Sequence, residues 1–361
     1  MAALPASRRF WTPSAPLRPV LTLGATQIVG FGSIYYAFGV LVGPMRADLG
    51  LSAPLAYGAL SAALLVGSLS APLAGRLIDR HGARSMMALG SLVTAAGFAV
   101  LSQVNGGLSL FAALALIEVL AALVLYDAAF AALAQAVGAR RARRAITLMT
   151  LIGGFASTVF WPLTLAFEQA WGWRGAYLAF AALHLLLCLP LHLSLPRRPQ
   201  DDPAQAGSDT GFVPLPAALH GKAMLLLGLG FSLSWMVMAA FSAQWVPVLG
   251  ALGLSQASAV AAGALMGPAQ VGARLLEMLL AGHRHPMITA LIAMACLTLA
   301  VVVLVLAPVG MLAASVFAVL FGIGQGLATM VRGTVPLALF GLAGYAARLG
   351  KLARLRMLVA A

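Results

Sequence analysis

Apolar segments of about 20 residues or more recur along nearly the whole chain, separated by short polar or charged stretches. An apolar helix of that length crosses the roughly 30 Å hydrocarbon core of a bilayer. The length rule predicts ten membrane-spanning helices, at about residues 19–45, 53–78, 84–103, 108–135, 144–168, 175–195, 221–246, 256–281, 286–307 and 309–331. The pattern therefore predicts an all-α, multi-pass membrane protein whose two termini lie on the same side.

Composition and charge agree with this prediction. Hydrophobic residues make up 62% of the chain and charged residues only 9%, whereas a soluble domain needs far more charge on its surface. The net charge of +13 does not indicate nucleic-acid binding, because the basic residues sit in short clusters between apolar segments. The lipid bilayer is the predicted partner, and nucleic acid is not.

The distribution of basic residues predicts the orientation in the membrane. When the loops are assigned to alternate sides, only Arg46 and Arg174 fall on one face, and the other 20 of the 22 basic residues fall on the opposite face. Such an excess marks the cytoplasmic side, so both termini are predicted to be cytoplasmic. The excess of arginine over lysine and the abundant alanine are typical of GC-rich bacterial genomes, which favours a bacterial inner membrane.

A charged loop interrupts the apolar pattern between the second and third predicted helices. It contains one acid and three arginines, and its marked positions are Gly75, Asp79, Arg80, Gly82 and Arg84. Topology charges alone explain the arginines but not the aspartate. Glycines permit a tight turn and close backbone approach, and a carboxylate can pair with an arginine or with a helix N-terminus.

The pattern G-x-L-x-D-R-x-G-x-R in this loop resembles the signature loop between helices two and three of the major facilitator superfamily of transporters. In that family the loop is a cytoplasmic latch that holds the outward-facing state, and this resemblance implies the same role here. The segment Gly172-Trp173-Arg174-Gly175 is similar to another loop of the family. The set Pro268, Gly272, Arg274 and Glu277 resembles a degenerate second copy of the latch loop.

The chain divides in the manner that the resemblance implies. A stretch rich in proline and charge at 196–220 reads as a cytoplasmic linker between a six-helix bundle at 1–195 and a second bundle at 221–361. Leu49-Gly50-Leu51-Ser52 after the first helix recurs as Leu252-Gly253-Leu254-Ser255 after the seventh, which favours duplication.

The second bundle is predicted to be incomplete, with about four helices. The family usually has twelve helices, and the basic residues after position 331 read as a cytoplasmic loop that ends where helix eleven should begin. Helix eleven normally walls the cavity and meets the latch, so Asp79 is predicted to lack its interdomain partner. Two functions stay open: secondary active transport of a small solute by alternating access, with or without protons, and an inserted but transport-inactive remnant.

Two acids in the fourth predicted helix carry most of the candidate chemistry. Glu118 lies near the middle of the helix, where an ionised acid costs about 2.5–3.5 kcal/mol, so it is a functional candidate and a candidate for proton coupling. Asp127 lies near the cytoplasmic end, and its predicted partner is Arg80 or Arg84. Nine residues of helix place the two acids about 180° apart, which predicts that they do not share one site.

Other polar side chains at membrane depth are candidates for the lining of a central cavity, because the resemblance implies that helices one, four, seven, eight and ten line it. They are Gln27, Tyr35, Trp235, Gln270, Arg274 and Gln325. Interhelical packing is the alternative for each of them, and Arg274 has Glu277 as a nearby ion-pair partner.

No cofactor, metal site or enzymatic centre is predicted. His220, His283 and His285 lie in a basic region where solvated side chains are the simpler interpretation, and Cys188 and Cys296 are far apart in apolar segments. The sequence has no phosphate-binding loop of the G-x-x-x-x-G-K-[ST] type, so the chain is not expected to use ATP itself. The predicted ligand is a small solute, and the sequence gives no signal of oligomeric state.

Overall fold

A computed structural model describes residues 17–196, 212–263, 265–281, 284–308 and 310–360. Within these ranges every regular element is a helix, which confirms the all-α prediction. Residues 197–211, most of the predicted linker, lie outside the described residues.

The described residues of the first half begin with nine helical elements. They are α1 (Leu17–Phe31), the π-helical turn η1 (Gly32–Tyr36), α2 (Ala37–Leu49), α3 (Ala53–His81), α4 (Ala83–Leu101), α5 (Gly107–Ala121), α6 (Tyr126–Val137), α7 (Ala139–Gly153) and α8 (Ala156–Leu183). The π-helical turn η2 (His184–Cys188) and α9 (Leu189–Leu193) extend α8. Inside α8, Gly172 has non-helical dihedrals (φ 66°, ψ 176°), so the chain turns at the predicted Gly-Trp-Arg loop.

The described residues of the second half contain fewer helical elements than those of the first half. They comprise the 3₁₀ turn η3 (Ala217–Leu219), α10 (His220–Ala251), α11 (Gln256–Gly263), α12 (Met266–Leu276), the π-helical turn η4 (Glu277–Ala281), α13 (Pro286–Leu306), α14 (Met311–Phe340) and α15 (Tyr345–Ala360).

Eight helical stretches of the described residues are long and apolar enough to cross a membrane, against ten predicted spans. One of the eight, Arg141–Leu193, contains two predicted spans joined at the Gly172 bend. The predicted span at 256–281 is divided between α11 and α12 and is not among the eight.

The end of the chain differs from the prediction. The tenth span does not stop at 331, since α14 continues to Phe340. Gly341 (φ 70°) and Gly344 (φ 62°) then make a turn that favours glycine, and α15 follows. The predicted cytoplasmic loop is therefore largely helical, and Arg332 and Arg356 within it are buried.

The repeated tetrapeptide takes the same local structure in both halves. Gly50 (φ 64°) and Gly253 (φ 89°) each follow a helix in a left-handed conformation. Ser52 and Ser255 then accept hydrogen bonds from the backbone N–H groups of Leu55 and Ser258, at 3.4 and 3.2 Å, and so cap the next helix. This agreement supports the predicted duplication.

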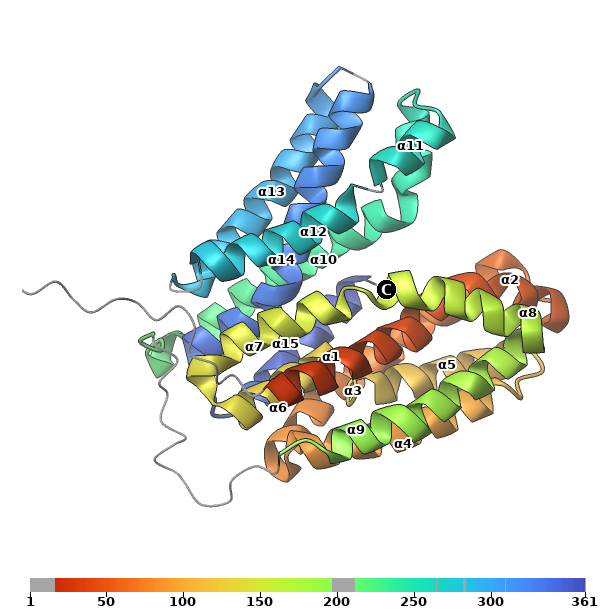
Figure 1. The fold of residues 1–361 in the computed structure, drawn as a ribbon, viewed down its shortest axis with the longest axis horizontal. Helices are drawn as coiled ribbons and strands as arrows, with labels where there is room; N and C mark the ends of the chain where they lie inside the picture. The colour runs from red at the N-terminus through yellow and green to blue at the C-terminus, as the bar shows by residue number, and fades with distance from the viewer. Residues whose placement is uncertain (1–16, 197–211, 264, 282–283, 309, 361) are drawn as a thin grey trace, which may run out of the picture.

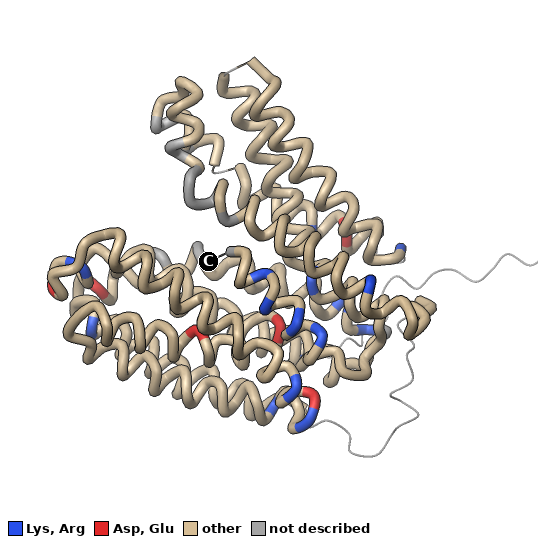
Figure 2. The backbone as a smooth tube through the Cα atoms, turned by 180° about the vertical axis from the view of Figure 1, so that it is seen from behind, with Lys and Arg blue, Asp and Glu red and all other residues tan. Residues whose placement is uncertain are grey.

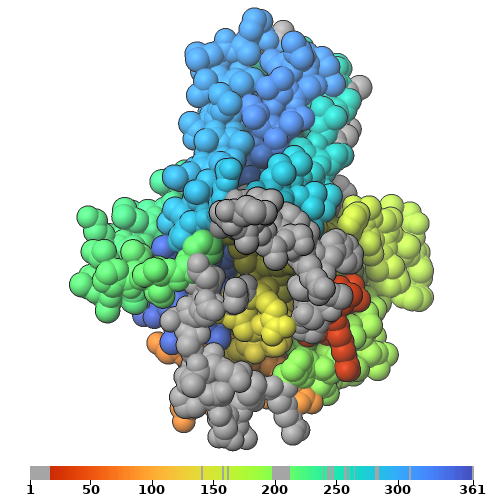
Figure 3. Space-filling view, turned by 60° about the vertical axis from the view of Figure 1, so that its left-hand side comes forward, coloured from red at the N-terminus to blue at the C-terminus, as the bar shows by residue number. Residues whose placement is uncertain are grey.

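Figure 1 shows two helical groups that meet around α7, α14 and α15 and diverge toward the far ends of α11 and α8. The space-filling view has α13 and α14 standing above the first half (Figure 3). The most extensive contact between the halves is that of α15 with α3. Charged residues gather near helix ends and around the centre of the molecule, while the helix segments between them are mostly uncharged (Figure 2).

Candidate functional site: a cavity between two latched halves

Asp79 in the predicted latch loop binds the N-terminus of α15. Its Oδ1 accepts a hydrogen bond from Ala346 N at 3.2 Å, and its Oδ2 accepts one from Ala347 N at 2.8 Å. The first N–H groups of a helix have no partner within the helix and carry partial positive charge, so a carboxylate is well placed there. The prediction that Asp79 lacks a partner in the second half is wrong, because α15 supplies one.

Two glycines let α3 and α15 approach this closely. A Cβ added at Gly75 would lie 2.2 Å from the carbonyl oxygen of Ala346, and one at Gly350 would lie 2.2 Å from that of Ala71. Both obstructing atoms belong to backbone, which cannot move aside as a flexible side chain does. Gly75 and Gly350 therefore set the distance between the two halves at this end.

Gln135 of α6, which was not predicted to be a site residue, stabilises the turn after Asp79. Gly82 has φ +82°, as its predicted role in a tight turn requires. Gln135 of α6 accepts a hydrogen bond from Ala83 N at 2.8 Å through its Oε1. Arg80 is exposed and Arg84 is half-buried. A glutamine three residues before a helix-ending glycine gave no recognisable signal.

A second charged contact joins the halves through Glu277. Arg143 of α7 pairs with Glu277 Oε1, and Thr289 Oγ1 donates to the same oxygen at 3.1 Å. Arg274 does not pair with Glu277 as the sequence suggested. Its Nε donates to Gly326 O at 3.0 Å and its Nη1 donates to Thr150 O at 2.9 Å. Arg274 therefore ties α12 to α14 and to α7 of the first half.

A cavity of about 240 Å³ lies between the halves, next to the contact of α3 with α15. Its walls come from α1, η1, α3, α5 and α6 of the first half and from α10, α14 and α15 of the second. The ionisable residues that line it are Tyr35, Glu118, Tyr126, Asp127, Arg332 and Arg356. Phe31 and Trp235 add two further aromatic rings, so the lining combines charge with apolar surface.

Glu118 and Asp127 line the same cavity, contrary to the prediction. The prediction assumed one continuous helix, but α5 ends at Ala121 and α6 begins at Tyr126. Gln27 donates from Nε2 to Val124 O at 2.8 Å, which satisfies a carbonyl of this non-helical break. The break interrupts the helical periodicity between the two acids, and both line one cavity.

Asp127 pairs with two arginines of the second half. Its Oδ2 lies 3.1 Å from Arg356 Nη2, and its Oδ1 lies 3.4 Å from Arg332 Nε. The predicted pairing with Arg80 or Arg84 is therefore wrong. Both guanidinium groups also lie over the Trp235 ring, with centroid distances of 5.3 Å for Arg356 and 5.9 Å for Arg332. Arg332 and Arg356 were missed because they had been assigned to a loop.

Glu118 is 2% exposed and accepts a hydrogen bond from Tyr35 Oη at 3.4 Å. Of the predicted lining residues, Tyr35, Glu118 and Trp235 line this cavity. Gln27 is instead buried against the helix break, and Gln270 donates to Gln325 at 2.7 Å between α12 and α14. Those three glutamines and Arg274 are not part of the cavity wall.

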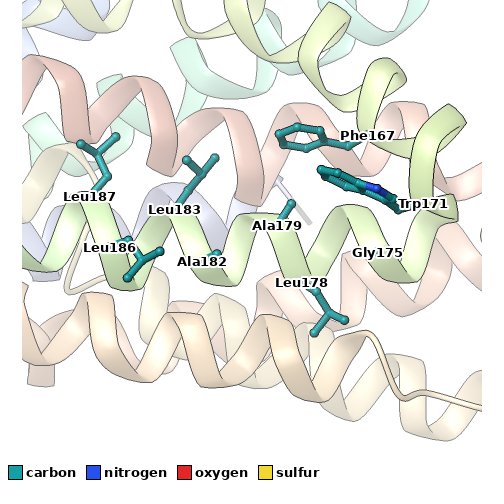
Figure 4. Close-up of a pocket in the computed structure, with 9 residues that line it drawn as sticks. All are labelled: Phe167, Trp171, Gly175, Leu178, Ala179, Ala182, Leu183, Leu186 and Leu187. Carbon is teal, nitrogen blue, oxygen red and sulfur yellow. The ribbon is translucent and has the colours of Figure 1, made fainter.

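An apolar hollow of about 560 Å³ lies away from the central cavity, along the two limbs of α8 and η2 (Figure 4). Phe167, Trp171 and Gly175 form one end, and the leucine side chains at 178, 183, 186 and 187 continue along the helix. It presents no charged side chain. Such a surface suits contact with lipid chains rather than recognition of a polar solute.

Within the described residues, no three His, Cys, Asp or Glu side chains gather as a metal site would require. His285 accepts from Met287 N at 3.2 Å and caps α13, and a ring nitrogen of His220 lies 3.0 Å from Leu215 O. His283 lies outside the described residues.

The fold is similar to those of solved transporters. The chain superposes on the human organic anion transporter MFSD10 (TETRAN) with a TM-score of 0.68 and 15% identity, over 96% of this chain and 93% of that one. It also superposes on the proton:xylose symporter XylE bound to 6-bromo-6-deoxy-D-glucose, with a TM-score of 0.63 and 15% identity over 95% and 86% of the two chains. A double-tryptophan variant of XylE gives a TM-score of 0.69 at 14% identity. At these identities the likeness shows the fold alone.

No curated protein matches the chain in sequence. The sequence model of the Major Facilitator Superfamily matches residues 23–353, which is most of the chain. This match over most of the chain, in agreement with the fold, establishes that the chain belongs to the major facilitator superfamily, whose members are membrane transporters.

Proposed function

We propose that the protein is a secondary active transporter of a bacterial inner membrane, which moves a small solute by alternating access in exchange with or together with protons. The observation that carries this proposal is Glu118, a buried carboxylic acid in the cavity between the two halves. An acid at membrane depth is expected to face a solute or proton path. The similar structures, an organic anion transporter and a proton:xylose symporter, agree with this class of function.

The latch supports the alternating-access part of the proposal. The halves contact each other through Asp79 and α15, and again through Glu277 and Arg143, at the end that carries most of the basic loops. The helices diverge away from that end (Figure 1). If the basic end is cytoplasmic, this arrangement corresponds to an outward-facing state. One ground for the inactive-remnant alternative was a missing partner for Asp79, and α15 supplies that partner.

Proton coupling requires a group that exchanges a proton in step with the solute. Burial disfavours the charged form of a carboxylic acid, while the hydrogen bond from Tyr35 favours it, so solute in the cavity can change the balance at Glu118. The other ionisable groups that face the same space are Tyr35, Tyr126, Asp127, Arg332 and Arg356. Asp127 is already engaged by both arginines, which leaves Glu118 as the acid that is free to exchange.

Purified protein in liposomes that contain a trapped pH-sensitive dye tests this function. Sugars, amino acids and carboxylates are added outside in turn at equal external pH. We expect at least one solute to change the internal pH faster than it does in protein-free liposomes. If none of the solutes moves protons above the protein-free rate, although flux of the labelled solute itself is raised by the protein, the coupling part of the proposal is wrong.

A further inference from the structure

The cavity holds one more basic group than its half-buried aspartate, Asp127, can balance. Two guanidinium groups, of Arg332 and Arg356, share the single carboxylate of Asp127. Both arginines are buried, at 6% and 7% exposed. The remaining acid, Glu118, accepts a hydrogen bond from Tyr35, and no arginine among the described residues is within hydrogen-bond distance of it. When Glu118 carries a proton, the lining therefore has a net charge of +1.

The arginines also retain unused hydrogen-bonding capacity. Arg356 donates from Nη2 to Asp127, but its buried Nη1 has no hydrogen-bond acceptor among the described residues. Arg332 Nε lies at an ion-pair distance of 3.4 Å and likewise makes no hydrogen bond. Buried donors of a charged group that lack an acceptor are costly, so the cavity favours a ligand that brings one.

The size and the walls of the cavity restrict the rest of the ligand. A cavity of about 150 Å³ is known to take up one benzene molecule. The volume of about 240 Å³ therefore suits a body of one ring with a small polar group attached. Trp235, Tyr126 and Phe31 present aromatic surface, and Trp235 lies beside both guanidinium groups. A ligand with an apolar body and a group that accepts the N–H groups of the two guanidinium ions is complementary to these walls.

We infer that the solute is a small organic monocarboxylate with an apolar, ring-sized body, bound by Arg356 and Arg332 while its body contacts Trp235. This substrate class rests on the transport function proposed above. A single carboxylate supplies the missing charge and accepts the unpaired N–H of Arg356. A neutral solute of the same size can accept this N–H but supplies no charge, and a cationic solute adds to the net positive charge.

The test compares ligands that differ only in charge. Isothermal titration of the purified full chain in detergent is carried out with benzoate, benzamide and benzylamine, at a pH low enough to keep Glu118 protonated. Benzoate is expected to bind, with benzamide roughly tenfold to hundredfold weaker, because a charge-assisted bidentate contact is lost. Benzylamine is expected not to bind. Equal affinity for benzamide and benzoate, or preferential binding of benzylamine, overturns the inference.

Two arginine variants on the same helix separate recognition from a general effect of charge. Arg356→Gln is expected to lose benzoate binding, while Arg354→Gln, at an exposed position two residues away, is expected to keep it. Unchanged affinity in Arg356→Gln contradicts the inference. If that variant does not fold, Arg356→Lys and the ligand comparison on the unmodified protein decide the question.

The outcomes also distinguish this inference from the function on which it rests. If benzoate does not bind but another solute still drives proton movement in liposomes, the substrate class is wrong and the proposed function stands. If benzoate binds as expected but no solute moves protons, the anion site stands and the coupling proposal fails.

Discussion

An Asp127→Asn variant is expected to be less stable than the unmodified protein by about 3 kcal/mol, at the lower end of the range for breaking a buried ion pair. The amide fills nearly the same volume, so packing changes little. What is lost is the one negative charge that Arg332 and Arg356 share across the two halves. Two buried guanidinium groups would then face each other without a counter-ion. Thermal unfolding of the detergent-purified protein, followed by tryptophan fluorescence, measures the change.

A matched variant and a compensating one make this prediction specific. Asp48→Asn removes a carboxylate in the last turn of α2 that pairs with the exposed side chain of Arg174, where water screens the charges, and little effect is expected. Adding Arg356→Met to Asp127→Asn removes one of the two uncompensated charges and should restore part of the stability. If Asp127→Asn is as stable as Asp48→Asn, the ion-pair network is not holding the halves together.

Glu118→Gln is expected to abolish proton-driven uptake while the protein still inserts and folds. Glutamine has nearly the shape of a protonated glutamic acid and can still accept the hydrogen bond from Tyr35. It cannot release or bind a proton in the relevant pH range. Exchange of solute for solute across the membrane, which needs no net proton movement, is expected to persist. Uptake into proteoliposomes under an imposed pH gradient, together with solute counterflow, measures both activities.

Glu168→Gln provides the control for this change. Glu168 lies in α8, outside the cavity lining, so its variant should keep both uptake and counterflow. Unaltered pH dependence of uptake in Glu118→Gln would remove Glu118 from the mechanism.

The fold was predictable from the sequence because it follows from local rules. Apolar length and the Gly172 turn placed most of the spans near their observed bounds, and the positive φ of Gly82 followed from its predicted place in a tight turn. The break between α5 and α6 was not predictable. Residues 122–125 are Ala-Leu-Val-Leu, which contain no glycine or proline, and the break is stabilised by contacts such as Gln27 to Val124 from another helix.

Only part of the site was predictable, because the rest also depends on contacts between residues that are distant in sequence. Tyr35, Glu118 and Trp235 stand out as polar or amphipathic groups at membrane depth, but the arginines opposite them were assigned to a loop. Their burial depends on Asp127 and on aromatic rings that are distant in sequence. One local signal was available, since residues 331–340 form an apolar run with Arg332 as its single charge. A loop would have been more polar.

The central claim is that the cavity is closed at the Asp79 end and opens to the other side. A chain without Cys188 and Cys296 carries a single new cysteine, either Met357→Cys in the cavity wall or Ser85→Cys at the exposed start of α4. Each is treated with a membrane-impermeant thiol reagent in right-side-out and inside-out vesicles.

The close contact of Gly75 with α15 supplies a further variant for the same labelling measurement. Gly75→Ala forces α3 and α15 apart, whereas Gly58→Ala on the same helix meets open space.

Labelling of the cavity cysteine is therefore the most direct measurement. We predict that Ser85→Cys reacts in inside-out vesicles and that Met357→Cys reacts in right-side-out vesicles. Adding Gly75→Ala, but not Gly58→Ala, should increase the reaction of Met357→Cys from the inside-out side. Reaction of Met357→Cys from the same side as Ser85→Cys in the unmodified latch, with no change on adding Gly75→Ala, would contradict the claim.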